Sequence, residues 1–233
     1  MDSVQTRPKF TPVPIPPESR KQFEREDWLS TQKDHPNHLF PDIPPGSKVL
    51  AIGDGGGWTG QDAGMARFDA SDPDPEAITW RKERNPADPS IIGIGEDLSD
   101  YPDDTYDFLY ARGAIMFMDM PKFFAEADRV TVPGATIWLL YHSWKKTARH
   151  FLKSARAGNW KDMIYRVYVY LNGLLFHFTG RLMRFPLNRK RLESFQTKKV
   201  LIRELEAHGF TDVRFPATRP GQIPVCVVAT KRR

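Results

Sequence analysis

Short apolar runs alternate with amphipathic segments from residue 48 to the end of the chain. The runs stop at Gly, Pro or Asp, as buried parallel strands do. They predict strands at 48–52, 65–69, 91–94, 106–110, 135–141, 213–215 and 225–230. Apolar residues three and four positions apart predict helices at 121–130 and 199–208. This alternation predicts a doubly wound, Rossmann-like α/β fold, with a mostly parallel seven-stranded sheet and an antiparallel edge strand.

Two residues mark where these helices begin and end. Asp119 precedes the helix at 121–130 and is placed to cap its first turn. Gly209 follows the helix at 199–208, where a residue in the left-handed conformation often ends a helix. We therefore expect both helices to stop close to these positions.

Proline content and helical spacing divide the chain into three parts. Nine of the twenty prolines lie in residues 1–45, which predicts an extended N-terminal arm around one short helix at 19–32. Residues 46–142 and 198–233 contain the predicted strands and form the core. Residues 143–197 interrupt this core after the fifth strand and are predicted to form a helical insertion.

The net charge of +5 is unevenly distributed. Residues 144–203 hold fifteen Lys and Arg but only two acidic residues, a net charge of +13, while the rest of the chain carries −8. This asymmetry indicates an anionic partner, which could be a membrane, a nucleic acid or an acidic substrate. Nucleic acid is the least favoured of these because the sequence has no evident basic-aromatic binding motif.

Composition also excludes several kinds of site. A single cysteine, Cys226, excludes an internal disulfide framework and metal sites with several cysteine ligands. The Asp, Glu and His residues show no metal-ligand spacing, so no metal is expected. Residues 1–10 do not resemble a secretion signal, which predicts a cytoplasmic location, with peripheral contact at the inner face of the membrane left open.

A glycine-rich segment, GDGGGWTG at 53–60, directly follows the first strand. Gly55, Gly57 and Gly60 satisfy the G-x-G-x-x-G pattern, in which glycines let a ligand approach the backbone. A flexible turn is the simpler alternative for a segment this rich in glycine. A nucleotide-like ligand is favoured by acidic residues at the ends of the next two predicted strands, namely Asp69, Glu96 and Asp97.

Three further segments accompany the strand and glycine loop at 49–57. They are an aromatic-Pro-Asp turn with its strand at 101–113, a helix and Pro-Gly turn at 124–134, and a helix ending in Gly-Phe at 204–210. In this order the four segments resemble class I S-adenosylmethionine-dependent methyltransferases, of the type 11 kind with a short first loop. The resemblance implies a methyltransferase with S-adenosyl-L-methionine as cofactor. It implies cofactor contacts from Gly53, Asp54, Gly55, Gly57, Asp69, Glu96, Asp97 and Arg112.

The chain departs from this family's pattern in three places. Ala51 stands where the family usually has an acidic residue, and Asp54 is expected to take over its contact with the cofactor's amino acid end. Only residues 58–64 separate the glycine loop from the next strand, so the first helix is predicted to be vestigial or absent. The third-strand acid could be either Glu96 or Asp97.

A nicotinamide-dependent oxidoreductase is the alternative for the same glycine pattern. Its ribose-binding acid should lie about 20 residues past the glycines. Asp69 lies only nine residues past Gly60, and the oxidoreductase alternative leaves the motif at 101–113 unexplained. The methyltransferase interpretation is therefore favoured.

His142 is the candidate general base for methyl transfer to oxygen, because it follows the fifth strand and imidazole titrates near neutral pH. A hydrogen-bonded structural histidine is the alternative. Arg112, at the end of the fourth strand, is a candidate to orient the acceptor. The favoured acceptor is small or lipid-linked, with a sugar hydroxyl as the methylated group. A non-catalytic cofactor-binding accessory protein is the other possibility.

The insertion contains an apolar stripe at helical spacing over residues 160–185. Its members are Trp160, Ile164, Val167, Leu171, Leu174, Phe178, Leu182 and Phe185. The stripe could belong to a lid helix packed on the body or to an interfacial helix on an anionic membrane. The insertion could also recognise an anionic acceptor, such as a phosphorylated or diphosphate-linked sugar. The contacts would then be Arg181, Arg184, Arg189, Lys190 and Arg191.

Overall fold

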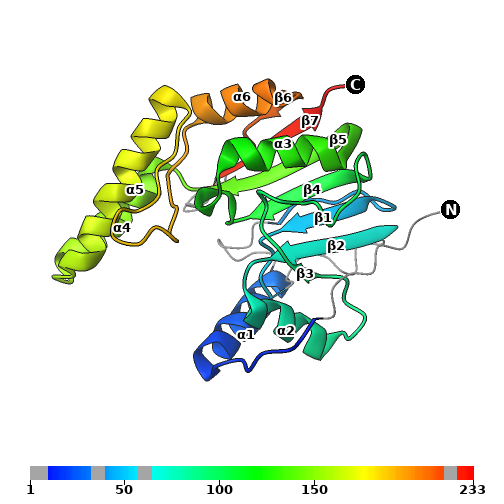
Figure 1. Cartoon of the computed structure of the whole chain (residues 1–233), viewed down its shortest axis with the longest axis horizontal. Helices are drawn as coiled ribbons and strands as arrows, with labels where there is room; N and C mark the ends of the chain where they lie inside the picture. Colours follow the sequence, from blue (N-terminus) through cyan, green and yellow to red (C-terminus); the bar gives the residue numbers. More distant parts are fainter. Residues whose placement is uncertain (1–9, 33–39, 57–64, 218–224) are drawn as a thin grey trace.

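The computed structural model describes residues 10–32, 40–56, 65–217 and 225–233 (Figure 1). A seven-stranded sheet with the order β3-β2-β1-β4-β5-β7-β6 forms its centre. The strands are β1 (Lys48–Ile52), β2 (Arg67–Asp72), β3 (Ile91–Ile92), β4 (Tyr106–Arg112), β5 (Thr131–Tyr141), β6 (Phe210–Arg214) and β7 (Val225–Lys231). β1 to β5 run parallel, and β7 pairs antiparallel with β5 and β6. The predicted fold class is confirmed, with the reversed strand lying just inside the edge strand β6.

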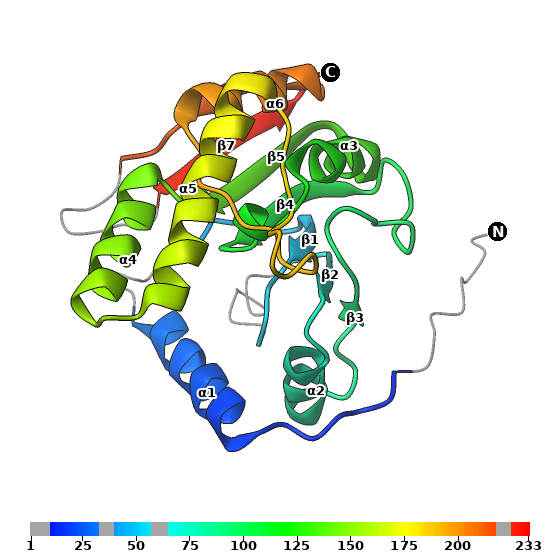
Figure 2. The same cartoon turned by 60° about the vertical axis from the view of Figure 1, so that its left-hand side comes forward.

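Helices surround this sheet in three groups (Figures 1 and 2). They are α1 (Pro17–Thr31), α2 (Pro75–Arg84), η1 (Ile115–Phe117), α3 (Met120–Val130), α4 (Trp144–Arg156), α5 (Trp160–Thr179) and α6 (Lys198–Ala207). α3 and α6 cover one face of the sheet, while α1 and α2 contact each other near its β3 edge. α4 and α5 form a hairpin beyond the ends to which the strand arrows point.

α2 was missed by the sequence analysis, although its start carries clear signals. Asp74 occupies the N-cap position and its side chain accepts the backbone N–H of Glu76, while Pro75 lies in the first turn. These features satisfy an otherwise unpaired donor and preset the backbone for a helix. The helix was hidden from the sequence pattern because its buried run, Ala77 to Arg81, includes the polar residues Thr79 and Arg81.

The core lies on both faces of the sheet. On the face covered by α3 and α6, strand residues such as Leu50 and Leu109 pack with Phe123, Phe124 and Leu201, all fully buried. On the other face a second cluster gathers around Tyr110 and Trp138 and is joined by partly buried residues, namely Ile43, Met65, Phe68 and Val228. The start of the glycine loop and the carboxyl ends of β2, β4 and β5 lie at one edge of this packed sheet.

Several predicted boundaries differ from the structure. β5 begins at Thr131 and not at 135, and β6 spans Phe210–Arg214 and not 213–215. β2 continues to Asp72, so the expectation that Asp69 ends the second strand is wrong. Asp119 occupies the N-cap position of α3, but its side chain makes no capping hydrogen bond; the carboxylate lies 3.9 Å from Lys122 Nζ instead. Gly209 adopts the left-handed conformation, with φ of 84°, as predicted. The short loop at 58–64 lies outside the described residues.

The insertion folds as α4, α5 and a returning segment at 180–197. α5 ends at Gly180, which has φ of 70°, so Leu182 and Phe185 lie beyond the helix that the stripe predicted. Two hydrogen bonds connect the returning segment to the ends of the strands: Ser194 N–H donates to the Met116 carbonyl at 3.0 Å, and Gln196 N–H donates to that of His142 at 2.8 Å. Within the described residues, no helix has both the length and the apolarity to cross a membrane.

Candidate functional site

The glycine loop passes close to its neighbours at the carboxyl end of β1. Gly53 and Gly55 have φ of 64° and 55°, a region that favours glycine. A Cβ added at Gly53 would lie 2.3 Å from the Cβ of Ala114, so no side chain fits there. The backbone at Gly53 therefore packs directly against Ala114, two residues after β4. Gly57 lies outside the described residues.

Asp72 is the acidic residue that the structure places at the end of β2. Its carboxylate accepts the backbone N–H of Gly55 at 2.7 Å and that of Asp74 at 2.8 Å. The side chain is buried, and burial raises the pKa of Asp72 despite these two hydrogen bonds. Sequence reasoning missed this residue, although the turn Asp72-Pro73-Asp74-Pro75 that leads into α2 is a usable signal.

Asp69 lies inside β2, three residues before the strand end. At about 3.3 Å per residue, this places it on the order of 10 Å from Asp72 along the strand. Its buried carboxylate accepts the Tyr106 hydroxyl at 2.8 Å and pairs with Arg67. Asp69 therefore lies away from the end of β2, and its cofactor contact stays a prediction.

Asp54 and Arg81 form the centre of a buried ionic network. Arg81 Nη1 donates to Asp54 at 2.7 Å, and its other guanidinium nitrogens donate to Asp88 at 3.2 and 3.1 Å. Tyr110 Oη donates to Asp54 at 3.0 Å. Burial alone would lower the pKa of Arg81, but the charges of Asp54 and Asp88 outweigh it and raise that pKa. Contact of Asp54 with the cofactor stays a prediction.

Arg112 lies at the end of β4 under the N-terminal arm. Its guanidinium pairs with Glu26 at 3.3 Å and lies 4.5 Å from the centre of the Phe40 ring. Burial lowers the pKa of Arg112, whereas the charges of Asp54 and Glu26 oppose this shift. Glu26 on α1 and Phe40 thus lie at the end of β4, and they hold Arg112 there.

The structure distinguishes Glu96 from Asp97. Glu96 Oε1 accepts the backbone N–H of Asp119 at 2.9 Å, which connects the segment after β3 to the start of α3. Asp97 is exposed, and its hydrogen bonds with Ser99 lower its pKa. Glu96 is therefore the acid of the two that is held in place beside the start of α3. A cofactor contact of Glu96 or Asp97 stays a prediction.

His142 lies at the end of β5 in a cationic environment. Its ring contacts Lys146 Nζ and lies 6.3 Å from the ring of Phe117. Burial, followed by the charges of Lys146, His150 and Arg166, lowers the pKa of His142 to about 3. The imidazole is neutral at pH 7 but binds a proton weakly, which makes it a poor general base. This geometry favours the structural alternative.

The depressed pKa predicts that acid destabilises the protein through His142. The unfolded residue binds a proton below pH 6.5, whereas the folded one does so only near pH 3. Stability is therefore lost as the pH falls through this window, by on the order of 2 kcal/mol between pH 7.5 and 5. His142→Gln should reduce this loss in urea unfolding curves. If the variant and the parent protein lost the same stability between pH 7.5 and 5, the lowered pKa of His142 would be contradicted.

The five basic residues predicted to contact an acceptor lie on the segment after α5. Arg181, Arg184, Arg189, Lys190 and Arg191 are all exposed. Phe185 anchors this segment by packing on Tyr165 and Tyr168, with ring centres 5.2 and 4.9 Å apart. The positive charges therefore stand in solvent on an ordered segment that is attached to η1 and the end of β5.

The described residues form no group of three or more potential metal ligands from His, Cys, Asp and Glu.

Comparison with known proteins assigns the core. Residues 50–139 match a family model described as a methyltransferase domain. This match identifies residues 50–139 as a methyltransferase domain. The match spans β1 to β5 and includes Asp72 and Arg112, and it favours methyl transfer over nicotinamide-dependent oxidation. The predicted enzyme class and cofactor are thereby confirmed.

Solved structures show the same fold for the methyltransferase domain. An S-adenosylmethionine-dependent methyltransferase of Methanosarcina mazei is 20% identical, with a TM-score of 0.54 over 83% of this chain and 99% of that chain. A Thermotoga maritima methyltransferase, described as a possible histamine N-methyltransferase, is 15% identical, with a TM-score of 0.56 over 92% and 97% of the two chains. The search of curated proteins found no match.

Proposed function

We propose that the methyltransferase domain methylates a hydroxyl of a small or lipid-linked anionic acceptor, with a phosphorylated or diphosphate-linked sugar as the acceptor class. The observation that carries this proposal is the exposed basic segment 181–191. It leads directly into Ser194 and Gln196, which donate hydrogen bonds to the carbonyls of Met116 and His142 after β4 and β5. S-adenosylmethionine supplies an electrophilic methyl group, so the protein's task is to bind both partners and position the acceptor oxygen.

The residues at this edge fit the cofactor. Gly53 and Gly55 have positive φ values and no side chains that would cover the loop backbone, and Asp72 presents a buried carboxylate beside it. A carboxylate in this position can accept hydrogen bonds from both hydroxyls of a ribose. We therefore assign the contact with the cofactor's ribose to Asp72, in place of the cofactor contact that the sequence analysis gave to Asp69.

The positioning of the acceptor is assigned to the basic segment. Guanidinium groups bind phosphate oxygens through paired hydrogen bonds, and the exposed arginines here have no carboxylate that neutralises them within the segment 181–191. The weak basicity of His142 means that the acceptor proton leaves to water or to another group. Catalysis by positioning is consistent with an in-line displacement that needs no covalent intermediate.

Charge reversal tests the acceptor site. Arg184→Glu/Arg189→Glu should raise the KM for an anionic sugar by at least about tenfold, because two charge-assisted contacts become repulsive. Cofactor affinity should stay unchanged. The assay measures transfer of labelled methyl groups to a phosphosugar, a nucleoside-diphosphate sugar and a lipid-diphosphate sugar, each beside its neutral sugar.

The matched control is Lys48→Glu, an exposed charge at the opposite end of β1. It should leave the KM for every acceptor unchanged. Equal transfer to neutral and anionic sugars would contradict recognition of the negative charge. A protein that binds the cofactor but methylates none of these acceptors would support the non-catalytic alternative.

A further inference from the structure

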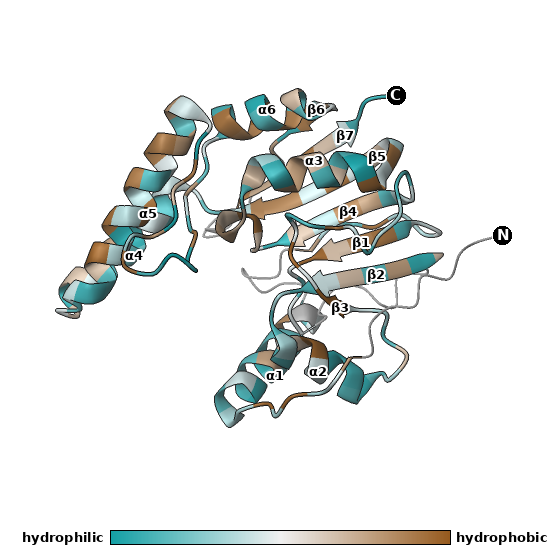
Figure 3. Cartoon of the chain, viewed as in Figure 1, coloured by the Kyte–Doolittle hydropathy of each residue, from teal (hydrophilic) through white to brown (hydrophobic). Residues whose placement is uncertain are grey.

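The outward face of α5 is apolar along its whole length. Six apolar residues spaced three or four apart share this face, namely Trp160, Ile164, Val167, Leu171, Leu174 and Phe178. Trp160, Leu171 and Phe178 are 63, 56 and 76% exposed. The stripe therefore does not pack on the body, as a lid helix would, and it is visible as brown bands along α5 in Figure 3.

The opposite face of α5 fixes this orientation. Asn172 is fully buried; it donates to the Glu193 carbonyl at 2.9 Å and accepts the Met183 N–H at 2.8 Å. A Cβ added at Gly173 would lie 2.3 Å from the ring of Phe195, so the returning segment packs directly on the helix backbone. Rotating the stripe inward would bury it at the expense of these contacts.

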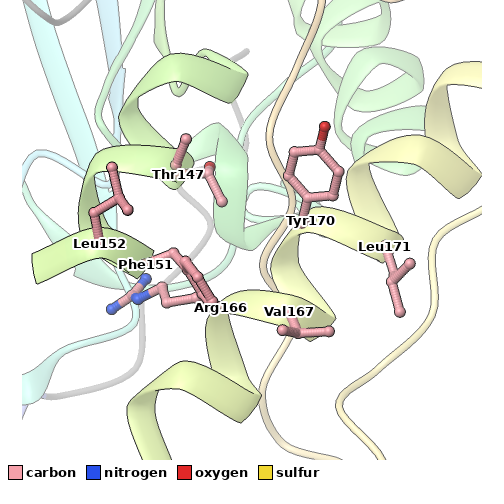
Figure 4. Close-up of a pocket in the computed structure, with 8 residues that line it drawn as sticks. Thr147, Phe151, Leu152, Arg166, Val167, Tyr170 and Leu171 are labelled. Atoms are coloured by element: carbon pink, nitrogen blue, oxygen red, sulfur yellow. The ribbon is translucent and has the colours of Figure 1, made fainter. Parts of the chain in front are cut away.

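α4 extends the apolar surface into a groove. A cavity of about 380 Å³ lies between the two helices, with Phe151 and Leu152 on α4 and Val167 and Leu171 on α5 among its lining residues (Figure 4). Val167 and Leu171 belong both to the groove and to the stripe. We call the stripe and the groove together the hairpin face. An exposed apolar surface of this kind indicates a partner.

Positive charge borders the hairpin face and is not neutralised. α4 has no acidic residue, and its exposed basic residues lie beside its apolar side, namely Lys145, Arg149, Lys153 and Arg156. Asp162 and Glu193, the two acids of the insertion, both pair with Arg166. Exposed tryptophan and phenylalanine beside a cationic strip is the pattern of helices that lie in the interface of anionic membranes.

We infer that the hairpin face docks on an anionic phospholipid bilayer, with α5 lying in the interfacial plane. A second copy of the chain is disfavoured as the occupant, because two hairpins of the same positive charge would repel. The inference does not depend on the identity of the acceptor. It does place the ends of the strands beside a membrane, where a lipid-linked acceptor would present its headgroup.

Vesicle sedimentation of the full chain tests this inference. The protein should pellet with vesicles of phosphatidylglycerol and phosphatidylcholine at low salt, and at least about tenfold more weakly with phosphatidylcholine alone. Trp160→Ser/Phe178→Ser should weaken binding to the anionic vesicles by at least about tenfold, because two side chains leave the interface. Retained cofactor binding and an unchanged melting temperature would show that the variant is folded.

Trp28→Ser is the matched control, since Trp28 on α1 is 54% exposed but lies outside the hairpin face. It should pellet like the parent protein. Failure of the parent protein to pellet at low salt would overturn the inference, and so would equal pelleting of the double variant. A concentration-dependent dimer that the double variant loses would assign the hairpin face to a second copy instead.

Discussion

Asp72→Asn should weaken the binding of S-adenosylmethionine by about tenfold to a hundredfold, as measured by calorimetric titration. The carboxylate lies at the end of β2, buried beside the N–H of Gly55, where it can accept hydrogen bonds from a ribose. Hydrogen bonds to a charged group contribute about 1.5–3 kcal/mol, which sets the size of the effect. The amide keeps the shape of the side chain and removes its charge.

Asp69→Asn is the matched control because both carboxylates are buried in the same strand. Asp69 pairs with Tyr106 and Arg67 and lies three residues from the strand end, so its replacement should leave cofactor affinity unchanged. The reverse outcome, a loss with Asp69→Asn and none with Asp72→Asn, would restore the original prediction from the sequence. It would also show that the cofactor does not bind at the end of β2, where Asp72 lies.

Arg81→Met should destabilise the protein by about 3–5 kcal/mol, because it leaves two buried carboxylates without their counter-charge. Asp54 and Asp88 both depend on this guanidinium, which is almost fully buried. Urea unfolding at pH 7 measures the loss. The loss should shrink toward pH 5, since a folded state that has lost the charge of Arg81 binds protons more readily.

Arg84→Met provides the comparison on the same helix. Arg84 is half exposed and pairs with Asp27 at the surface, so its removal should cost less than about 1 kcal/mol. Arg81→Met/Asp54→Asn/Asp88→Asn should recover part of the stability that Arg81→Met loses, because no buried charge remains. Equal losses for the two single variants would contradict a special role of the buried network.

The same network has a consequence for the glycine loop. Asp54 lies between Gly53 and Gly55, so its bonds to Arg81 and Tyr110 fix the loop from one side. The bond from Gly55 to Asp72 fixes it from the other. These bonds hold residues 53–55 in shape, and a segment that is already ordered loses less entropy when a ligand binds.

The sequence by itself determined the fold class, the order of most elements and the cofactor. β1, β4 and β7 follow from apolar runs that end at turn residues, and each lies close to its predicted range. These features are local, because strand burial and helix ends depend on residues that are neighbours in the chain. The glycine loop was recognisable for the same reason.

Only the tertiary structure decided which acid reaches the site and which way α5 faces. Asp69 and Asp72 lie three residues apart in β2, and pairing with β1 and β3 determines where that strand stops. The stripe on α5 has the spacing of a buried face, but the close contact of Gly173 with Phe195 buries the other side. Periodicity shows which residues share a face, whereas long-range packing decides whether that face meets the core or the solvent.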